Sequence, residues 1–297
     1  MQRITLSDSL SVSRIIYGLW RHTDDPDISS QKLQSKIEAC LDQGISTFDQ
    51  ADIYGGYTSE SLLGKTLKQA SHLRDSMEII TKCDIVAPIG PYNDKRVKHY
   101  DTSAQHIYSS VERSLSQMAI DQIDLLLLHR PDPLMDAQET GSVLDTLVAS
   151  GKVKGIGVSN FKPWDIDLLQ SCTQNRLLTN QIEISLLQNS ALTNGELAYL
   201  QQHKIKPMAW SPLGGGALFK NKQTPLLQKL TSIANSYDVN PSSVAIAWLT
   251  RHPATIMPIM GSNDLQRIKQ FPEALSIDLS TEEWFELLQI ATGKEVA

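Results

Sequence analysis

Three ionisable residues stand where apolar runs of the sequence end. Asp49 follows ISTF, Lys82 follows EIIT and His129 follows LLLL. Because an isolated charge at such a place is costly to bury, we expect Asp49 and Lys82 to form an ion pair. Tyr54 follows five residues after Asp49. An ammonium group stabilises a neighbouring phenolate, so we expect Lys82 to lower the pKa of Tyr54 from its usual value of about 10, which would let this phenol protonate a developing alkoxide.

Other interpretations of these residues remain open. Tyr57, three residues after Tyr54, is an alternative proton donor that spacing does not exclude. Lys82 could serve as the Schiff-base lysine of an aldolase, although a carboxylate partner would keep it charged and non-nucleophilic. Cys83 alternates to the opposite strand face, which favours a buried thiol over a nucleophile. Among seven histidines only His129 ends a strand, and no HxH or HExxH motif occurs, so we expect no metal.

A regular alternation of strand-like and helix-like segments must position these side chains. Two short strands, Arg3–Leu6 and Leu10–Ser13, form a plausible hairpin before the alternation begins. Eight apolar runs then end near Trp20, Asp49, Lys82, His129, Asn160, Glu183, Ser211 and Gly261. Helical stretches at 29–44, 59–70, 103–118, 136–151, 162–172, 192–203, 225–237, 241–252 and 280–290 separate or follow them. This order predicts a (β/α)8 barrel with an N-terminal β-hairpin, forming one domain over residues 1–297. A doubly wound sheet is the alternative. In a barrel, strand carboxyl ends meet at one mouth, where active sites lie.

Composition restricts the classes of partner. The chain has 297 residues, and 27 basic against 33 acidic residues give a net charge of −6 without charged blocks. We therefore expect neither a nucleic-acid nor a membrane partner. Cys40, Cys83 and Cys172 show no disulfide or metal spacing, which is typical of a reducing compartment. Residues 1–14 are too polar for a signal peptide, so we expect a cytoplasmic protein.

Several separated motifs resemble those of the aldo-keto reductase family. They are GISTFDQADIYGGYTSESLLG (44–64), IITKC around Lys82, LLLLHRPDP around His129, GKVKGIGVSNF (151–161), NQIEIS (180–185) and PMAWSPLGGG (207–216). The run HRPDPLMD is most similar to a bacterial oxidoreductase branch of the family. The resemblance implies a (β/α)8 barrel that reduces aldehydes and ketones by hydride transfer from NADPH. It also implies a small-molecule carbonyl substrate and leaves the oligomeric state open.

The resemblance assigns a role to each of four residues at the expected mouth. Tyr54 would be the general acid, and Lys82 the group that lowers its pKa. Asp49 would hold Lys82 by an ion pair. His129 would orient the substrate carbonyl through a hydrogen bond, and Trp20, after the first strand, would line the substrate mouth.

Further matched positions imply an NADPH site. Trp210 would stack on the nicotinamide ring, while Ser262 and Arg267 would hold the 2′-phosphate. Gly261 stands where the family has a lysine, so we expect a weaker grip on that phosphate. The remaining implied cofactor contacts, to the carboxamide and the pyrophosphate, are Asp49, Ser159, Asn160, Gln181, Ser211, Pro212, Leu213, Gly214 and Gly215.

Two points stay undecided at this level. A barrel that binds the cofactor but serves as a regulatory module without turnover is the alternative function, although the intact set of four residues argues against it. The physiological substrate depends on the loops after the first, fourth and seventh strands, at residues 20–27, 130–136 and 213–225, and loops carry little readable pattern.

Overall fold

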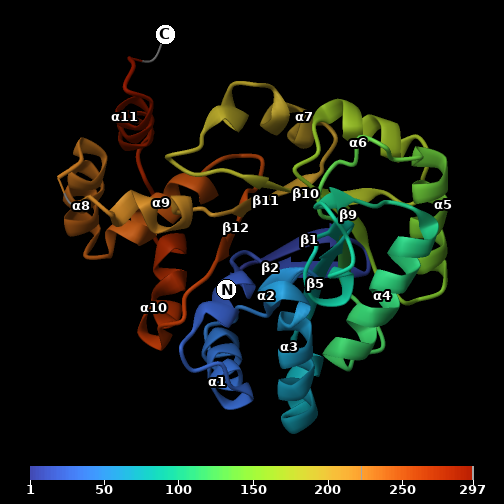
Figure 1. Ribbon diagram of the computed structural model, residues 1–297. Helices are drawn as coiled ribbons and strands as arrows, with labels where there is room; N and C mark the ends of the chain where they lie inside the picture. Colours follow the sequence, from blue (N-terminus) through green and yellow to red (C-terminus); the bar gives the residue numbers. More distant parts are fainter. Residues whose placement is uncertain (222, 296–297) are drawn as a thin grey trace.

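Eight parallel strands close into a barrel in the computed structural model, which describes residues 1–221 and 223–295 (Figure 1). In barrel order they are β3 (Ile16–Gly18), β4 (Thr47–Asp49), β5 (Glu78–Cys83), β8 (Leu125–Leu128), β9 (Ile156–Ser159), β10 (Leu177–Glu183), β11 (Lys206–Trp210) and β12 (Met257–Met260). β12 pairs with β3, which closes the barrel. The predicted barrel is confirmed, and every strand ends within two residues of its expected end.

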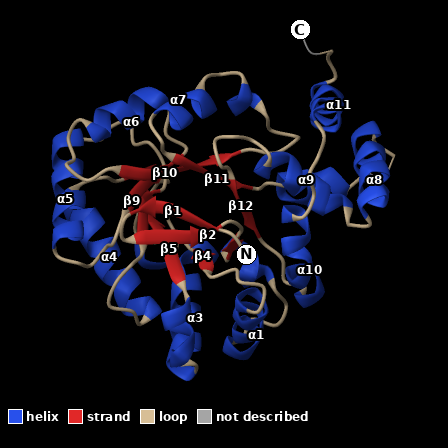
Figure 2. Ribbon diagram, turned by 180° about the vertical axis from the view of Figure 1, so that it is seen from behind, coloured by secondary structure: helices blue, strands red, loops and turns tan. Residues whose placement is uncertain are grey.

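Helices surround the strands on the outside, as Figure 2 shows. They are α1 (Ser30–Leu41), α2 (Tyr54–Tyr57), α3 (Ser59–Gln69), α4 (Ala104–Met118), α5 (Ala137–Ala149), α6 (Pro163–Gln170), α7 (Glu196–Gln202), α8 (Pro225–Tyr237), α9 (Pro241–Thr250), α10 (Leu265–Gln270) and α11 (Thr281–Thr292). Short polar side chains begin several of them: Ser29, Ser103 and Asp136 each accept a backbone N–H of the first turn. At the start of α11, Ser280 and Glu283 form a reciprocal capping box.

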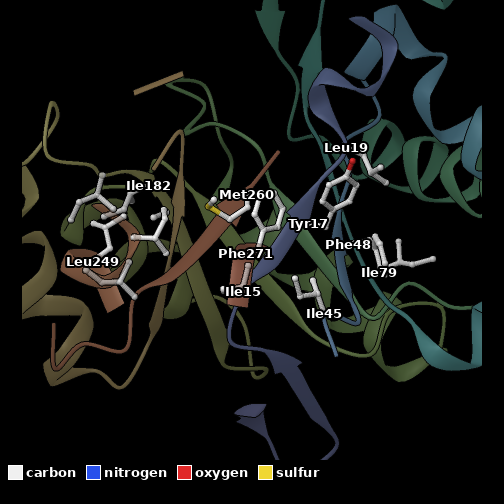
Figure 3. Packing of buried hydrophobic residues seen from close by; sticks show 14 of the residues in the cluster. Ile15, Tyr17, Leu19, Ile45, Phe48, Ile79, Ile182, Leu249, Met260 and Phe271 are labelled. Atoms are coloured by element: carbon white, nitrogen blue, oxygen red, sulfur yellow. The ribbon is translucent and has the colours of Figure 1, made fainter. Parts of the chain in front are cut away.

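Strand alternation sorts the side chains into two hydrophobic layers. On β5, Ile80 belongs to the inner cluster, whereas Ile79 and Cys83 belong to the cluster between strands and helices. Figure 3 shows part of this outer layer, in which Tyr17 and Phe48 meet edge to face with ring centroids 6.0 Å apart. Lys82 has the same parity as Ile80, so its side chain starts on the inner face of the barrel.

The predicted N-terminal hairpin is confirmed as an antiparallel pair of β1 (Arg3–Ser7) and β2 (Leu10–Ser13). It covers one end of the barrel. Its buried residues Ile4, Leu10 and Val12 belong to the same cluster as the inward-facing Ile80 and Leu127. In both ribbon views the hairpin crosses the barrel (Figures 1 and 2). Apolar side chains thus fill this end of the barrel interior.

Several elements were not expected from the sequence. A small antiparallel sheet of β6 (Ile85–Val86) and β7 (His99–Tyr100) follows β5, and the six-residue helix α10 follows β12. The loops also contain 3-10 turns, η1 (Trp20–Asp24), η2 (Ser71–Ser76), η3 (Gly90–Tyr92), η4 (Ser190–Leu192), η5 (Gly214–Phe219) and η6 (Phe271–Leu275). Within residues 1–221 and 223–295, none of the helices combines the length and the hydrophobicity needed to cross a bilayer.

Candidate active site

A buried ion pair lies at the carboxyl end of the barrel. The Lys82 Nζ atom is 2.8 Å from the Asp49 carboxylate, which confirms the predicted pair. Lys82 also donates to the Gln50 carbonyl at 2.7 Å and to the Tyr54 hydroxyl at 3.0 Å. The lysine is 0% exposed and Asp49 is 2% exposed. Gln181 Nε2 donates to the same carboxylate at 2.7 Å, so every charged atom of the pair has a hydrogen-bond partner.

The strand register explains why these two charges meet. Asp49 ends β4 and is the pairing partner of Ile80 on the neighbouring β5. Lys82 is two residues further along β5, on the same inner face. Its long side chain therefore reaches the Asp49 carboxylate across the barrel mouth. Burial lowers the pKa of Lys82, and the Asp49 carboxylate opposes this shift by stabilising the ammonium form.

Tyr54 begins α2 and lies directly beside Lys82. Gly55 and Gly56, which follow it, have φ values of 58° and 64°, a left-handed conformation that breaks the helix immediately after the tyrosine. The expected lowering of the Tyr54 pKa is wrong: burial raises it well above the usual value, and the Asp49 charge raises it further. The sequence indicated that the Lys82 ammonium group lies near Tyr54, but it did not indicate that the phenol is buried. The phenol is therefore protonated throughout the neutral pH range, as a proton donor must be.

The structure separates Tyr57 from this cluster. Its hydroxyl donates to the Ile85 carbonyl at 2.9 Å and accepts the Ala87 N–H at 3.0 Å. The Tyr57 side chain is buried, and its hydroxyl anchors the chain beyond β5. Among the residues described, Tyr54 is the phenol that contacts Lys82.

His129 follows β8 and faces Tyr54, with ring centroids 6.0 Å apart and planes at 77°. Burial and the positive charges of Lys82, Arg130 and Lys98 hold the pKa of His129 well below its usual value. The imidazole is therefore neutral at neutral pH, and one of its nitrogens carries a proton that it can donate. Its Nδ1 atom has no hydrogen-bond partner among the residues described.

These side chains line a pocket of about 800 Å³ at the barrel mouth. All but two of the predicted site residues are found in its lining. They are Trp20, Asp49, Tyr54, His129, Ser159, Asn160, Gln181, Trp210, Ser211, Pro212, Leu213, Gly215, Ser262 and Arg267. The exceptions are Lys82, which is fully buried behind Asp49 and Tyr54, and Gly214, where an added Cβ would approach Leu187 to 2.7 Å.

A chain of hydrogen bonds orients the Trp210 ring. Trp210 Nε1 donates to Asn160 Oδ1 at 2.9 Å, and Asn160 Nδ2 donates to Ser159 Oγ at 2.8 Å. Ser159 Oγ in turn donates to the Gln181 carbonyl at 3.0 Å. These partners fix the indole so that it flanks the pocket, and a fixed aromatic face can hold a flat heteroaromatic ring by stacking.

Two other parts of the pocket lining have features that a phosphate group requires. Ser211, Gly215 and Gly216 have φ values of 48°, 63° and 91°, so residues 211–216 form a tight turn with little side-chain obstruction. The Arg267 side chain is 75% exposed and is 3.8 Å from its ion-pair partner Asp264, a loose contact that leaves donors free. Together with Trp210, these residues could hold a dinucleotide with the phosphates toward Arg267.

Three further cations line the pocket: Arg21, Lys98 and Arg130. Arg21 and Arg130 lie in loops that were expected to determine the substrate, whereas Lys98 was missed by sequence reasoning. Arg21 donates to the Gly215 carbonyl at 3.0 Å, which connects the loop after β3 to the glycine turn. Lys98 comes from the segment between β6 and β7, which carried no recognisable pattern. Arg21 and Arg130 directly follow the predicted site residues Trp20 and His129 and begin the expected substrate loops at 20–27 and 130–136.

Comparisons with known proteins agree with this geometry. Residues 14–291 match the model of the aldo/keto reductase family. The chain is 59% identical to the 6-dehydroglucose reductase of Agrobacterium fabrum and 43% identical to the uncharacterised oxidoreductase YcsN of Bacillus subtilis, each over 100% of both chains. An aldo-keto reductase from Klebsiella pneumoniae, solved in complex with NADPH, superposes with a TM-score of 0.82 at 25% identity, over 98% of this chain and 96% of that one. The chain therefore belongs to the aldo/keto reductase family and is an oxidoreductase.

Proposed function

We propose that this enzyme uses NADPH to reduce an aldehyde or ketone to an alcohol, with Tyr54 as the general acid. The observation that carries the proposal is the contact of Lys82 Nζ with both the Tyr54 hydroxyl and the Asp49 carboxylate, beside the neutral His129. A family relative was solved with NADPH bound, and the pocket lining includes both the Trp210 ring and the exposed Arg267.

Each of the four residues has a definite task in this reaction. His129 donates an N–H to the carbonyl oxygen and so orients the substrate. As negative charge develops on that oxygen, Tyr54 transfers its hydroxyl proton to it, and the product leaves as an alcohol. Lys82 stabilises the resulting phenolate through its 3.0 Å contact, while Asp49 keeps the lysine charged and in place. NADPH, when bound, would supply the hydride to the carbonyl carbon.

The remaining predicted residues would bind the cofactor. The Trp210 indole, fixed by Asn160, would stack on the nicotinamide, and the 211–216 turn would approach the pyrophosphate. Arg267 would contact the 2′-phosphate from its exposed position on α10. Since Gly261 supplies no second cation, the preference for NADPH over NADH would depend chiefly on this one guanidinium.

We infer that the substrate is a sugar aldehyde. The Agrobacterium relative, which shares 59% of its residues over its whole length, is a 6-dehydroglucose reductase. The HRPDPLMD segment after β8 and the four mouth residues all lie within the matched length.

A pair of tyrosine variants tests the proposed mechanism. Tyr54→Phe removes the proton donor and keeps the ring, so turnover of 6-dehydroglucose with NADPH should fall by at least about 10²-fold. NADPH affinity, measured by equilibrium titration, should change by less than a few-fold. The decrease in NADPH absorbance in the presence of the aldehyde gives the rate.

Tyr57→Phe is the matched control because it removes the same atom from a neighbouring phenol. It should keep near-normal turnover but lose some stability, since its hydroxyl bonds both Ile85 and Ala87. If Tyr57→Phe abolished reduction while Tyr54→Phe retained it, the assignment of the acid would be wrong. NADPH binding without turnover on any aldehyde would instead favour a regulatory, cofactor-binding module.

A further inference from the structure

Two cations stand beside the proposed catalytic residues without a carboxylate partner. Lys98 and Arg130, here called the mouth cations, both line the pocket, and their charges act on His129. Neither side chain lies within 4 Å of an Asp or Glu carboxylate among the residues described. The one acidic residue in the described lining, Asp49, is already paired with Lys82. The mouth cations therefore offer hydrogen-bond donors to the pocket and no acceptors.

The fold anchors both mouth cations at adjacent strand ends. The backbone N–H of Arg130 donates to the buried Asp84 carboxylate at 3.1 Å, directly after His129. The guanidinium carbon of Arg130 is 5.9 Å from the Trp210 ring centroid, a stacking contact that restrains it. Lys98 precedes His99, which pairs with Val86 in the small sheet after β5. Since β5 and β8 are neighbours in the barrel, the two cations share one side of the mouth.

An exposed aromatic ring also borders the mouth. Trp20 is 54% exposed, and its ring centroid is 6.5 Å from that of Tyr54. A large apolar ring left open to solvent inside a pocket is a usual platform for an apolar ligand face. The pocket thus presents donors and an aromatic surface to whatever is attached to the carbonyl at Tyr54.

We propose that Lys98 and Arg130 are specificity residues that donate hydrogen bonds to hydroxyl oxygens of a sugar aldehyde, while Trp20 packs against the C–H face of its ring. This proposal rests on the proposed function and deepens it. Sugar hydroxyls accept hydrogen bonds, and the C–H bonds of a pyranose form an apolar face, so one ligand satisfies both features of the mouth. An aldehyde without hydroxyls would displace water from the two cations without accepting hydrogen bonds from them. Leaving these donors unpaired weakens binding of such a substrate strongly.

Three aldehydes and two methionine variants test the assignment. The probes are 6-dehydroglucose, cyclohexanecarbaldehyde, which has a ring of the same size without hydroxyls, and 4-carboxybenzaldehyde, which carries an anion. Lys98→Met and Arg130→Met should each lower kcat/KM for 6-dehydroglucose by about 10- to 100-fold, mainly through KM, because each removes a charged donor. For cyclohexanecarbaldehyde, kcat/KM should stay within about threefold of the wild-type value or rise, because the variants remove a donor that this substrate leaves unpaired. Trp20→Ala should weaken both ring substrates to a similar degree.

Lys95→Met and Arg96→Met are the matched controls, since both residues are exposed in the same segment and neither lines the pocket. They should change none of the three rates by more than about twofold. Equal losses on 6-dehydroglucose and cyclohexanecarbaldehyde would overturn the hydroxyl assignment. A wild-type preference for 4-carboxybenzaldehyde that disappears in both variants would overturn it too, by showing that the mouth cations select an anion. If none of the aldehydes turned over, the proposed function itself would fail, and the inference with it.

Discussion

Replacing Lys82 by methionine tests the central ion pair without any ligand. Methionine is also unbranched and has a similar shape, so the change removes the ammonium group and leaves little cavity. The Asp49 carboxylate, 2% exposed, would keep only the Gln181 amide as a polar partner, and the Gln50 carbonyl would lose the 2.7 Å hydrogen bond from Lys82. A buried carboxylate would then have no countercharge.

The size of the effect follows from this loss. Removing one partner of a buried ion pair costs about 3–5 kcal/mol, because the remaining charge is uncompensated. Folding free energies of proteins are about 5–15 kcal/mol, so Lys82→Met should remove a large fraction of the total. Adding Asp49→Asn to Lys82→Met removes the unpaired charge. The double variant should therefore be more stable than the sum of the single effects predicts, by about 0.5–3 kcal/mol.

Urea unfolding followed by tryptophan fluorescence measures these free energies. Lys95→Met is the matched control, since that lysine is 44% exposed and pairs only with the exposed Asp94. It should change the free energy of unfolding by less than about 0.5 kcal/mol. Two results would refute the view that Lys82 supplies the countercharge of Asp49. One is a Lys82→Met protein as stable as this control, and the other is strict additivity of the two single effects in the double variant.

Three further predictions use the same protein. NADPH should quench tryptophan fluorescence, and Trp210→Leu should lose most of the quench and bind more weakly; an unchanged titration would contradict the stacking role. Arg267→Met should weaken NADPH by about 10- to 150-fold and NADH far less, by equilibrium titration, whereas equal losses would show that Arg267 does not touch the 2′-phosphate. Burial and the nearby Glu60 raise the pKa of Asp52 to about 8, so the folded state holds a proton that the unfolded state releases near pH 4. Stability should therefore fall as pH rises between these values, and urea unfolding of Asp52→Asn should show a shallower decline; parallel pH profiles would argue against the raised pKa.

The barrel could be predicted because each strand carries its own evidence. Runs such as IDLLLL are apolar on both faces, which is typical of parallel strands covered by helices, and their ends lie within two residues of the strand ends in the structure. The small sheet of β6 and β7 escaped prediction because each of its strands has two residues, too few to show alternation. The helix α10 has six residues, fewer than two turns, and so shows little of the helical period.

The cluster at the candidate active site was predictable for a different reason. Asp49 and Lys82 each end an apolar run, and the cost of burying either alone favours the pair that the structure contains. The pKa of Tyr54 was predicted in the wrong direction because the sequence shows which groups are neighbours but not how deeply they are buried. Lys98 could not be placed at the mouth because its position depends on a loop whose course only the folded chain defines.

The distribution of charge in the mouth shows why net charge says little about the ligand. The chain carries a net charge of −6, yet four cations with no tight carboxylate partner, Arg21, Lys98, Arg130 and Arg267, line the described pocket, and its one acid is neutralised by Lys82. Within about 8–10 Å, the range over which physiological salt leaves charges unscreened, a bound ligand experiences these cations and not the distant surface acids. An acidic protein can therefore attract a dinucleotide phosphate into this mouth. In the proposed reaction, the same local field would also favour the negative charge that develops on the carbonyl oxygen.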